Sequence, residues 1–184
     1  VCPKIIAKTN FPSSPPEENC QIEYRIELNI FFEVTIKHIH IIMIDTENLR
    51  YYCENQKWDV ILNYLISSDV STDEKKINLM GSEKSASCLH LACGGLCGNK
   101  FAPLDVIHLM LKIGGKDLVL KSKSNGDTVL HSVVLQYCVH SGSKRFAEMM
   151  HLLVKFGGKD LIKVRNNQGY TALNFACTDT TYAG

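Results

Sequence analysis

One seven-residue stretch occurs twice in this chain, and the repetition limits what the chain can fold into. Residues 113–119 read IGGKDLV, and residues 156–162, which lie 43 positions further on, read FGGKDLI. The register then continues, because residues 125–131 (NGDTVLH) align with residues 168–174 (QGYTALN) at the same spacing. Self-similarity at a fixed period of 20–50 residues is typical of stacked repeat architectures. We therefore expect a series of similar units that pack side by side.

A third and weaker copy begins at Ser85. Residues 85–93 (SASCLHLAC) align with residues 126–134 (GDTVLHSVV) and with residues 169–177 (GYTALNFAC). Each unit is predicted to contain a turn, a short helix, a loop and a longer helix, and a Gly-Gly pair ends the longer helix as an αL cap. A hydroxyl side chain stands in each unit where the N-cap of the short helix accepts a backbone N–H.

The pattern Gly-x-Thr-x-Leu-His, followed by two antiparallel helices, resembles the ankyrin repeat. The motif residues are Ser87, Leu89 and His90 in the first copy, Gly126, Thr128, Leu130 and His131 in the second, and Gly169, Thr171 and Leu173 in the third. The spacing is 41 residues from His90 to His131 and 43 from there to Asn174, against 33 in the usual repeat. The additional residues fall mostly between the two helices of a unit, so the chain resembles a diverged, long-period ankyrin type.

This resemblance implies an all-α fold, a solenoid of helix-turn-helix units with β-turn fingers at right angles to the helices. It implies that the motif histidines bond turn backbone. It also implies a non-enzymatic protein-interaction module, which binds a partner protein through the finger tips and the concave helix face. Stacked repeats expose long concave surfaces and bury only their mutual faces, so the physical argument points the same way.

The first 45 residues do not follow the repeat pattern. Residues 1–20 hold four of the five prolines and are expected to form an irregular tail. Residues 21–37 alternate between apolar and polar side chains, which predicts a β-like strand. We therefore divide the chain into an appendage, 1–45, and an array, 46–184. The array is predicted to hold a divergent first unit, two full units and a truncated unit, at 46–84, 85–125, 126–168 and 169–184. The chain is expected to be a fragment, because it begins at Val1 and breaks off soon after a new unit opens.

The eight cysteines do not predict a disulfide framework. The chain is long and rich in Leu, Ile and Val, so it has no need of cross-links to build a core. We expect free, buried thiols in a reducing compartment, the cytoplasm or the nucleus. No 18-residue apolar run occurs, so no membrane-spanning helix is predicted.

Four potential metal ligands, Cys88, His90, Cys93 and Cys97, lie within ten residues. Zinc favours Cys and His ligands, but structural sites usually present two short-spaced pairs, which are absent here. Cys88 and Cys93 also align with Val129 and Val134, which favours core positions. The sequence therefore predicts no metal, no cofactor and no catalytic residue. A Cys/His metal or redox site remains an alternative.

Basic side chains gather in the second half of the chain, where residues 85–184 carry 11 Lys/Arg and 6 Asp/Glu. Six of them fall at or near aligned turn positions and are the candidate partner-binding residues: Lys116, Lys121, Lys123, Lys159, Lys163 and Arg165. They are expected to form a ridge that contacts an acidic protein surface. Reversing Lys121, Lys123, Lys163 and Arg165 to Glu is expected to leave the fold intact, because all four are expected on loops. The simpler interpretation is that these side chains form a solvated edge that keeps the stack soluble and binds no partner. Nucleic acid is disfavoured as a partner, since the charge is modest and no aromatic residues interleave.

The alternative function is the recognition arm of a larger regulatory enzyme whose catalytic domain lies outside this chain.

Overall fold

The computed structural model describes residues 41, 44–83, 85–94, 101–139 and 143–178, which all belong to one compact unit spanning 41–184. Eight helices account for most of this part of the chain: α2 (Thr46–Glu54), α3 (Trp58–Ile66), α4 (Thr72–Met80), α5 (Cys88–Gly94), α6 (Leu104–Leu120), α7 (Val129–Val139), α8 (Lys144–Lys163) and α9 (Ala172–Thr178). Within these ranges the only β-type pairing is an isolated bridge between Ser122 and Thr128. This helical content agrees with the predicted all-α class. The predicted strand at 21–37 lies outside the described residues.

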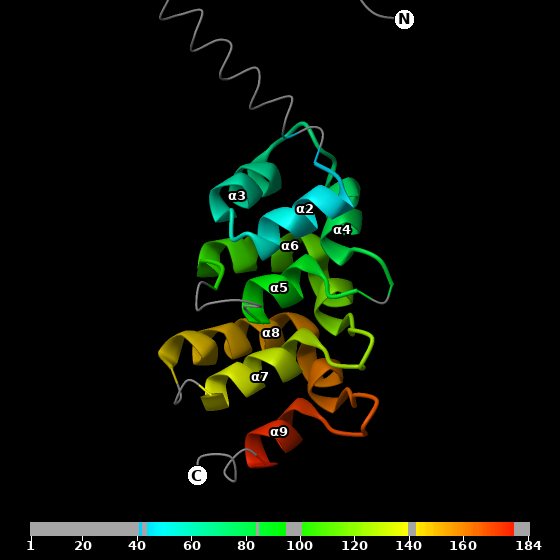
Figure 1. The fold of residues 1–184 in the computed structure, drawn as a ribbon, viewed down its shortest axis with the longest axis vertical. Helices are drawn as coiled ribbons and strands as arrows, with labels where there is room; N and C mark the ends of the chain where they lie inside the picture. The colour runs from blue at the N-terminus through cyan, green and yellow to red at the C-terminus, as the bar shows by residue number, and fades with distance from the viewer. Residues whose placement is uncertain (1–40, 42–43, 84, 95–100, 140–142, 179–184) are drawn as a thin grey trace, which may run out of the picture. The chain divides into compact units, whose positions relative to one another are not determined.

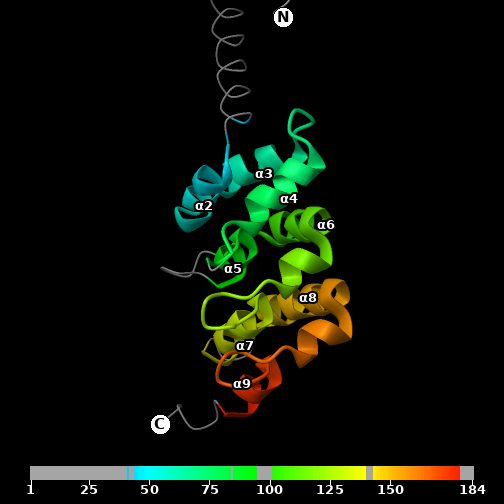
Figure 2. The same ribbon diagram turned by 90° about the vertical axis from the view of Figure 1, so that its right-hand side faces the viewer.

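The helices are arranged in two adjoining rows (Figures 1 and 2). In the first row α2 contacts α5, α5 contacts α7, and α7 contacts α9. In the second row α6 contacts α8, and both α3 and α4 pack against α6. Contacts between α5 and α6 and between α7 and α8 join the rows. The turns that lead into α5, α7 and α9 emerge on one side of the unit (Figure 1).

The buried side chains form one hydrophobic core that runs through both rows. Leu111, Leu118, Leu153 and Leu161 are all fully buried. Ile44 is 3% exposed and packs in the same core, so the folded unit includes residues that precede the predicted boundary at 46. Among the described residues no helix has the length and apolar character needed to cross a bilayer.

Local sequence explains where the helices of the first unit begin. The Asp45 carboxylate accepts a hydrogen bond from the Asn48 N–H at 2.9 Å and caps α2, and the Ser71 hydroxyl accepts from the Glu74 N–H at 3.2 Å and caps α4. Side-chain caps of this kind satisfy backbone donors that the first turn leaves open. The caps therefore fix where α2 and α4 begin.

The longer helices break at the two Gly-Gly pairs, as predicted, but the glycine at each break is not in the predicted αL conformation. Gly115 has φ 59° and ψ −152°, and Gly158 has φ 63° and ψ −155°, which is a positive φ with a ψ far from the αL region. The chain kinks there and continues as helix to Leu120 and Lys163. The glycine before each kink is needed for a different reason: a Cβ on Gly157 would lie 2.6 Å from the Leu161 Cβ. The pair thus combines a kink with a close approach of the following leucine.

Candidate partner-binding site

The turns before α7 and α9 have the same backbone hydrogen bonds. In the first, the Lys123 N–H donates to the Asp127 carbonyl and the Gly126 N–H donates to the Lys123 carbonyl, both at 2.9 Å. In the second, the equivalent donors of Asn166 and Gly169 reach the carbonyls of Tyr170 and Asn166, also at 2.9 Å. Gly126 and Gly169 have φ values of 81° and 84°, which favour glycine, as predicted for a tight turn.

The two turns also bond to each other. The Asn167 N–H donates to the Asn125 carbonyl at 3.1 Å, and its side-chain amide donates to the Ser124 carbonyl at 2.9 Å. The Asn166 amide donates to the Asp127 carboxylate at 2.9 Å. Hydrogen bonds between the two turns require that their backbones lie close together. At Gly126 the backbone of the second turn is so near that it leaves no room for a Cβ.

Replacing Gly126 by Ala is expected to destabilise the protein more than replacing Gly169. Both substitutions place a Cβ at a positive φ, which costs on the order of 1 kcal/mol. At Gly126 the added Cβ would also lie 2.6 Å from the Asn167 backbone nitrogen, whereas at Gly169 it would meet nothing within 4 Å. We expect Gly126→Ala to lower the unfolding free energy by about 2 kcal/mol or more in urea titrations. Equal losses would show that the two turns do not touch in solution.

The aligned histidines connect each short helix to the following turn. The His131 Nδ1 accepts from the Thr128 N–H at 3.2 Å and lies 2.9 Å from the Thr128 hydroxyl. Nδ1 is thereby an acceptor, so Nε2 carries the proton and donates to the Tyr170 carbonyl at 3.1 Å. His90 repeats the arrangement, with Nδ1 at 2.8 Å from the Ser87 hydroxyl and Nε2 at 3.3 Å from the Asp127 carbonyl.

The imidazole of His90 is held neutral. Burial, with a contribution from the positive charge of Lys123, lowers the pKa of His90 from 6.5 to about 4. In the third copy Asn174 takes the place of the histidine, and its side-chain oxygen accepts from the Thr171 N–H and hydroxyl, both at 2.8 Å. His90, His131 and Asn174 therefore hold the turns in place.

The hydroxyls of the motif act in more than one way. Ser87 and Thr171 accept the backbone N–H of the third following residue at 3.4 Å, which is the expected N-cap bond at its long limit. The Thr128 hydroxyl pairs with the His131 ring instead. The motif leucines differ in burial, because Leu89 is 0%, Leu130 6% and Leu173 65% exposed.

The six predicted basic residues are not a free ridge. Lys116 forms an ion pair with Asp160. Lys121 donates to three backbone carbonyls, those of Met80, Gly81 and Ser82, with 2.7 Å to the last. Lys123 donates to the Ser132 hydroxyl at 3.1 Å, and Arg165 donates to the Gly169 carbonyl at 2.7 Å. Within the described part of the chain, Lys159 and Lys163 are exposed and make no hydrogen bond or ion pair.

Replacing Lys121 by Met is expected to cost about 1–2 kcal/mol of stability. The ammonium binds the carbonyls at the end of α4, where a cation also interacts favourably with the helix dipole. Lys155→Met is the matched control, because that side chain is exposed in the middle of α8, away from the helix end, and should change stability by less than about 0.5 kcal/mol. Thermal midpoints of the two variants would give the comparison, and similar midpoints would contradict this role of Lys121. The expectation that Lys121 can be reversed to Glu without harm to the fold does not agree with these contacts.

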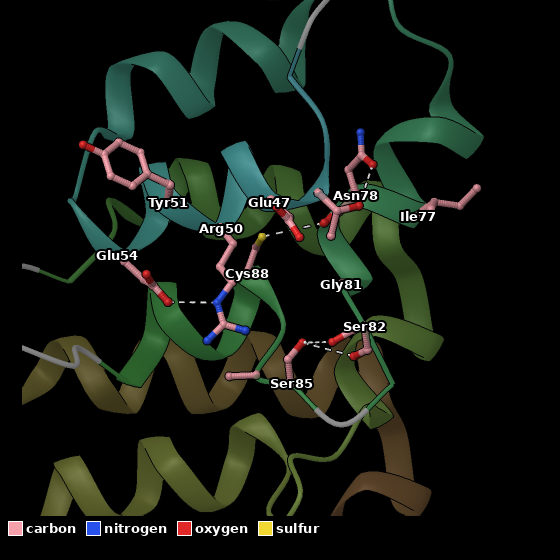
Figure 3. A pocket seen from close by; sticks show the side chains of 12 residues that line it. Glu47, Arg50, Tyr51, Glu54, Ile77, Asn78, Gly81, Ser82, Ser85 and Cys88 are labelled. Carbon is pink, nitrogen blue, oxygen red and sulfur yellow. Dashed lines mark hydrogen bonds and ion pairs between the residues drawn. The ribbon is translucent and has the colours of Figure 1, made fainter.

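An open groove of about 640 Å³ lies between α2 and the turn that leads into α5 (Figure 3). It is lined by Thr46, Glu47, Arg50, Tyr51, Glu54, Ile77, Asn78, Gly81, Ser82, Ser85, Ala86 and Cys88. Two large apolar side chains in this lining are exposed, Tyr51 to 59% and Ile77 to 66%. Sequence comparison missed the groove because α2 and α4 belong to the part of the chain without an aligned copy.

The groove has charged side chains on its α2 wall. The Arg50 Nε binds the Glu54 carboxylate at 2.8 Å. Glu47, in the first turn of α2, is exposed and makes no ion pair or hydrogen bond with any other described residue. At the base, the Asn78 amide donates to the Ile44 carbonyl and to the Tyr64 hydroxyl, so this buried side chain is already bonded.

The described cysteines are free thiols. Cys88 and Cys93 are buried, like Val129 and Val134 in the aligned positions. Contact with the Cys88 sulfur, together with burial, raises the pKa of the Cys53 thiol, and burial raises the pKa of Cys93 to about 12. Thiolates, not thiols, are the usual ligands and nucleophiles. In the ranges that the structure covers, no three Cys, His, Asp or Glu side chains form a group that could hold a metal ion, and Cys97 lies outside those ranges.

A scan against protein-family models gave no match, and searches of curated proteins and of solved structures found no significant similarity.

Proposed function

We propose that this chain is a non-enzymatic protein-interaction module built as an ankyrin-like stack of helix pairs. Three features support the stack: the repeated turn geometry, the bonds between neighbouring turns, and the two histidines that each reach the next turn. In this proposal α5, α7 and α9 are the first helices of successive units, and α6 and α8 are the second helices. Residues 46–84 form the divergent first unit.

The observation that carries the interaction function is the groove beside α2. It is open to solvent, and two of its lining residues, Tyr51 and Ile77, expose large apolar surfaces. Pockets of roughly 300–1,000 Å³ with apolar walls and a few polar groups are usual for binding sites. In an ankyrin-like stack this position corresponds to the angle between a first helix and its neighbouring finger. An acidic partner surface remains our proposal for the exposed Lys159 and Lys163 alone, since the other four basic residues bond within the chain.

Selection from a displayed library of random peptides, with the full 184-residue chain as bait, would test this function. We expect enrichment of a restricted set of sequences that bind the chain with Kd values in the micromolar range. Competition among the enriched peptides would show whether they share one site. If repeated rounds enrich no sequence above the background of an unrelated helical protein, the interaction function is wrong.

A further inference from the structure

We propose that the groove between α2 and the turn that leads into α5 binds a short segment of a partner protein that carries both apolar side chains and Lys or Arg. This inference rests on the proposed interaction function and names the chemistry of the partner.

The charges around the groove favour a cationic occupant. Residues 41–84 carry eight Asp/Glu and five Lys/Arg. Lys121, which donates to the carbonyls of Gly81 and Ser82 in the lining, adds one basic group from outside this range, and the acidic groups remain in excess. Two of the five basic groups are bound elsewhere, because Lys75 donates to the carbonyls of Leu65 and Ser67, and Lys76 pairs with Asp117. Arg50 is neutralised by Glu54. Glu47 is therefore the charged group in the lining that remains open, and it attracts a cation and repels an acidic segment.

The apolar side chains set where the rest of the segment lies. In Figure 3 Tyr51 and Ile77 stand on opposite sides of the groove, with Glu47 between them. A segment that crosses the groove can place an apolar side chain against each of them and a basic side chain between, over Glu47.

The base of the groove favours a peptide over a small polar ligand. Asn78 already bonds to Ile44, Tyr64 and the Thr46 hydroxyl, and the Ser82 and Ser85 hydroxyls bond to each other at 2.9 Å. Few polar groups in the lining are thus left to orient a small molecule. Affinity must come from the exposed apolar surface and from charge, which side chains of a peptide supply together.

Fluorescence anisotropy with three labelled probe peptides would test the inference on the full chain. The probes have about eight residues, in which Leu alternates with Lys, with Glu or with Ser. We expect the Lys probe to bind most tightly and the Glu probe least. Glu47→Lys should weaken the Lys probe about tenfold, because it replaces attraction by repulsion. Tyr51→Ser and Ile77→Ser should weaken the Lys and Ser probes alike.

Matched controls lie on exposed positions outside the lining. Glu148→Lys changes the same charge on α8, and Ile66→Ser removes a side chain that is 62% exposed on α3. Neither should alter binding of the Lys probe by more than about twofold. An equal loss for Glu47→Lys and Glu148→Lys would mean attraction by net charge alone and would overturn the inference.

Two other results separate this inference from the proposed function. If the Glu probe binds best and Lys159→Glu together with Lys163→Glu removes its binding, the groove is not the site, while the interaction function stands. If neither the probes nor a displayed library gives a ligand, the interaction function itself fails. Unchanged thermal midpoints of the variants would show that each result reflects binding and not folding.

Discussion

Replacement of His131 by Ala is expected to lower the unfolding free energy by about 4 kcal/mol. The imidazole is 1% exposed and connects the start of α7 to the next turn. Its removal leaves a cavity and deprives the buried Thr128 N–H and the Tyr170 carbonyl of a partner, and each such loss costs roughly 1–3 kcal/mol. Urea titration followed by circular dichroism would measure the change.

His131→Asn is the control that separates the two ends of the imidazole. Asn174 shows that a side-chain amide oxygen can accept from both the N–H and the hydroxyl of the motif threonine. An Asn at 131 can therefore keep the bonds to Thr128 and lose the one to Tyr170, and we expect about half of the loss seen with Ala. A loss below about 1 kcal/mol with Ala would show that the histidine does not hold the two turns together.

The sequence predicted those local features that lie in the aligned copies. Each copy carries its own hydroxyl, its own His or Asn and, in the second and third, its own turn glycine, so local geometry follows from local sequence. The burial of Cys88 and Cys93 could be predicted because the valines aligned with them mark core positions. Helix boundaries were less predictable at the Gly-Gly pairs, because the alignment cannot tell a kink from a stop.

The surroundings of the basic side chains could not be predicted from the alignment. Equal spacing along the sequence predicts which side chains lie side by side, but it does not predict which acidic or carbonyl groups of the same chain they contact. The repeated Lys-Asp pair illustrates this. Lys116 of one copy meets Asp160 of the next, and Lys76 meets Asp117 in the same way. Hydrogen bonding to Lys76 and Lys116 lowers the pKa of the Asp117 and Asp160 carboxyls. Lys116 and Lys159 align in sequence but do not form a continuous basic surface. Asp160, which aligns with Asp117, pairs with Lys116.

The groove was missed for a different reason, which is that two of its walls lie outside the aligned copies. The groove is formed by α2, by the end of α4 and by the turn that leads into α5, and neither of the two helices has an aligned copy. Exposed Tyr51 and Ile77 could be identified only once the packing of these helices was known. The aligned copies therefore predicted the geometry of the turns, whereas two walls of the candidate site come from residues without an aligned copy.

Stability is expected to fall by about 3 kcal/mol between pH 6.5 and pH 4 because of His90 alone. Above pH 6.5 the imidazole is neutral in both the folded and the unfolded chain. Below it the unfolded chain takes up a proton, while the folded chain does not until its lowered pKa of about 4 is reached. The unfolded state is therefore favoured by up to roughly 1.4 kcal/mol per pH unit across this window.

Urea titrations at a series of pH values, on the parent protein and on His90→Asn, would isolate this effect. The substitution removes the titrating group, and its amide oxygen can still bond to Ser87, as Asn174 bonds to Thr171. We expect the variant to be less stable than the parent at pH 7 and to lose much less stability between pH 6.5 and pH 4. The carboxyls of Asp117 and Asp160 have pKa values below their usual 3.8, so their contribution is present above that pH and is lost only as the pH falls further. Parallel pH curves for the two proteins would mean that His90 takes up its proton equally in the folded and unfolded states, and that the turn at Asp127 does not bury it in solution.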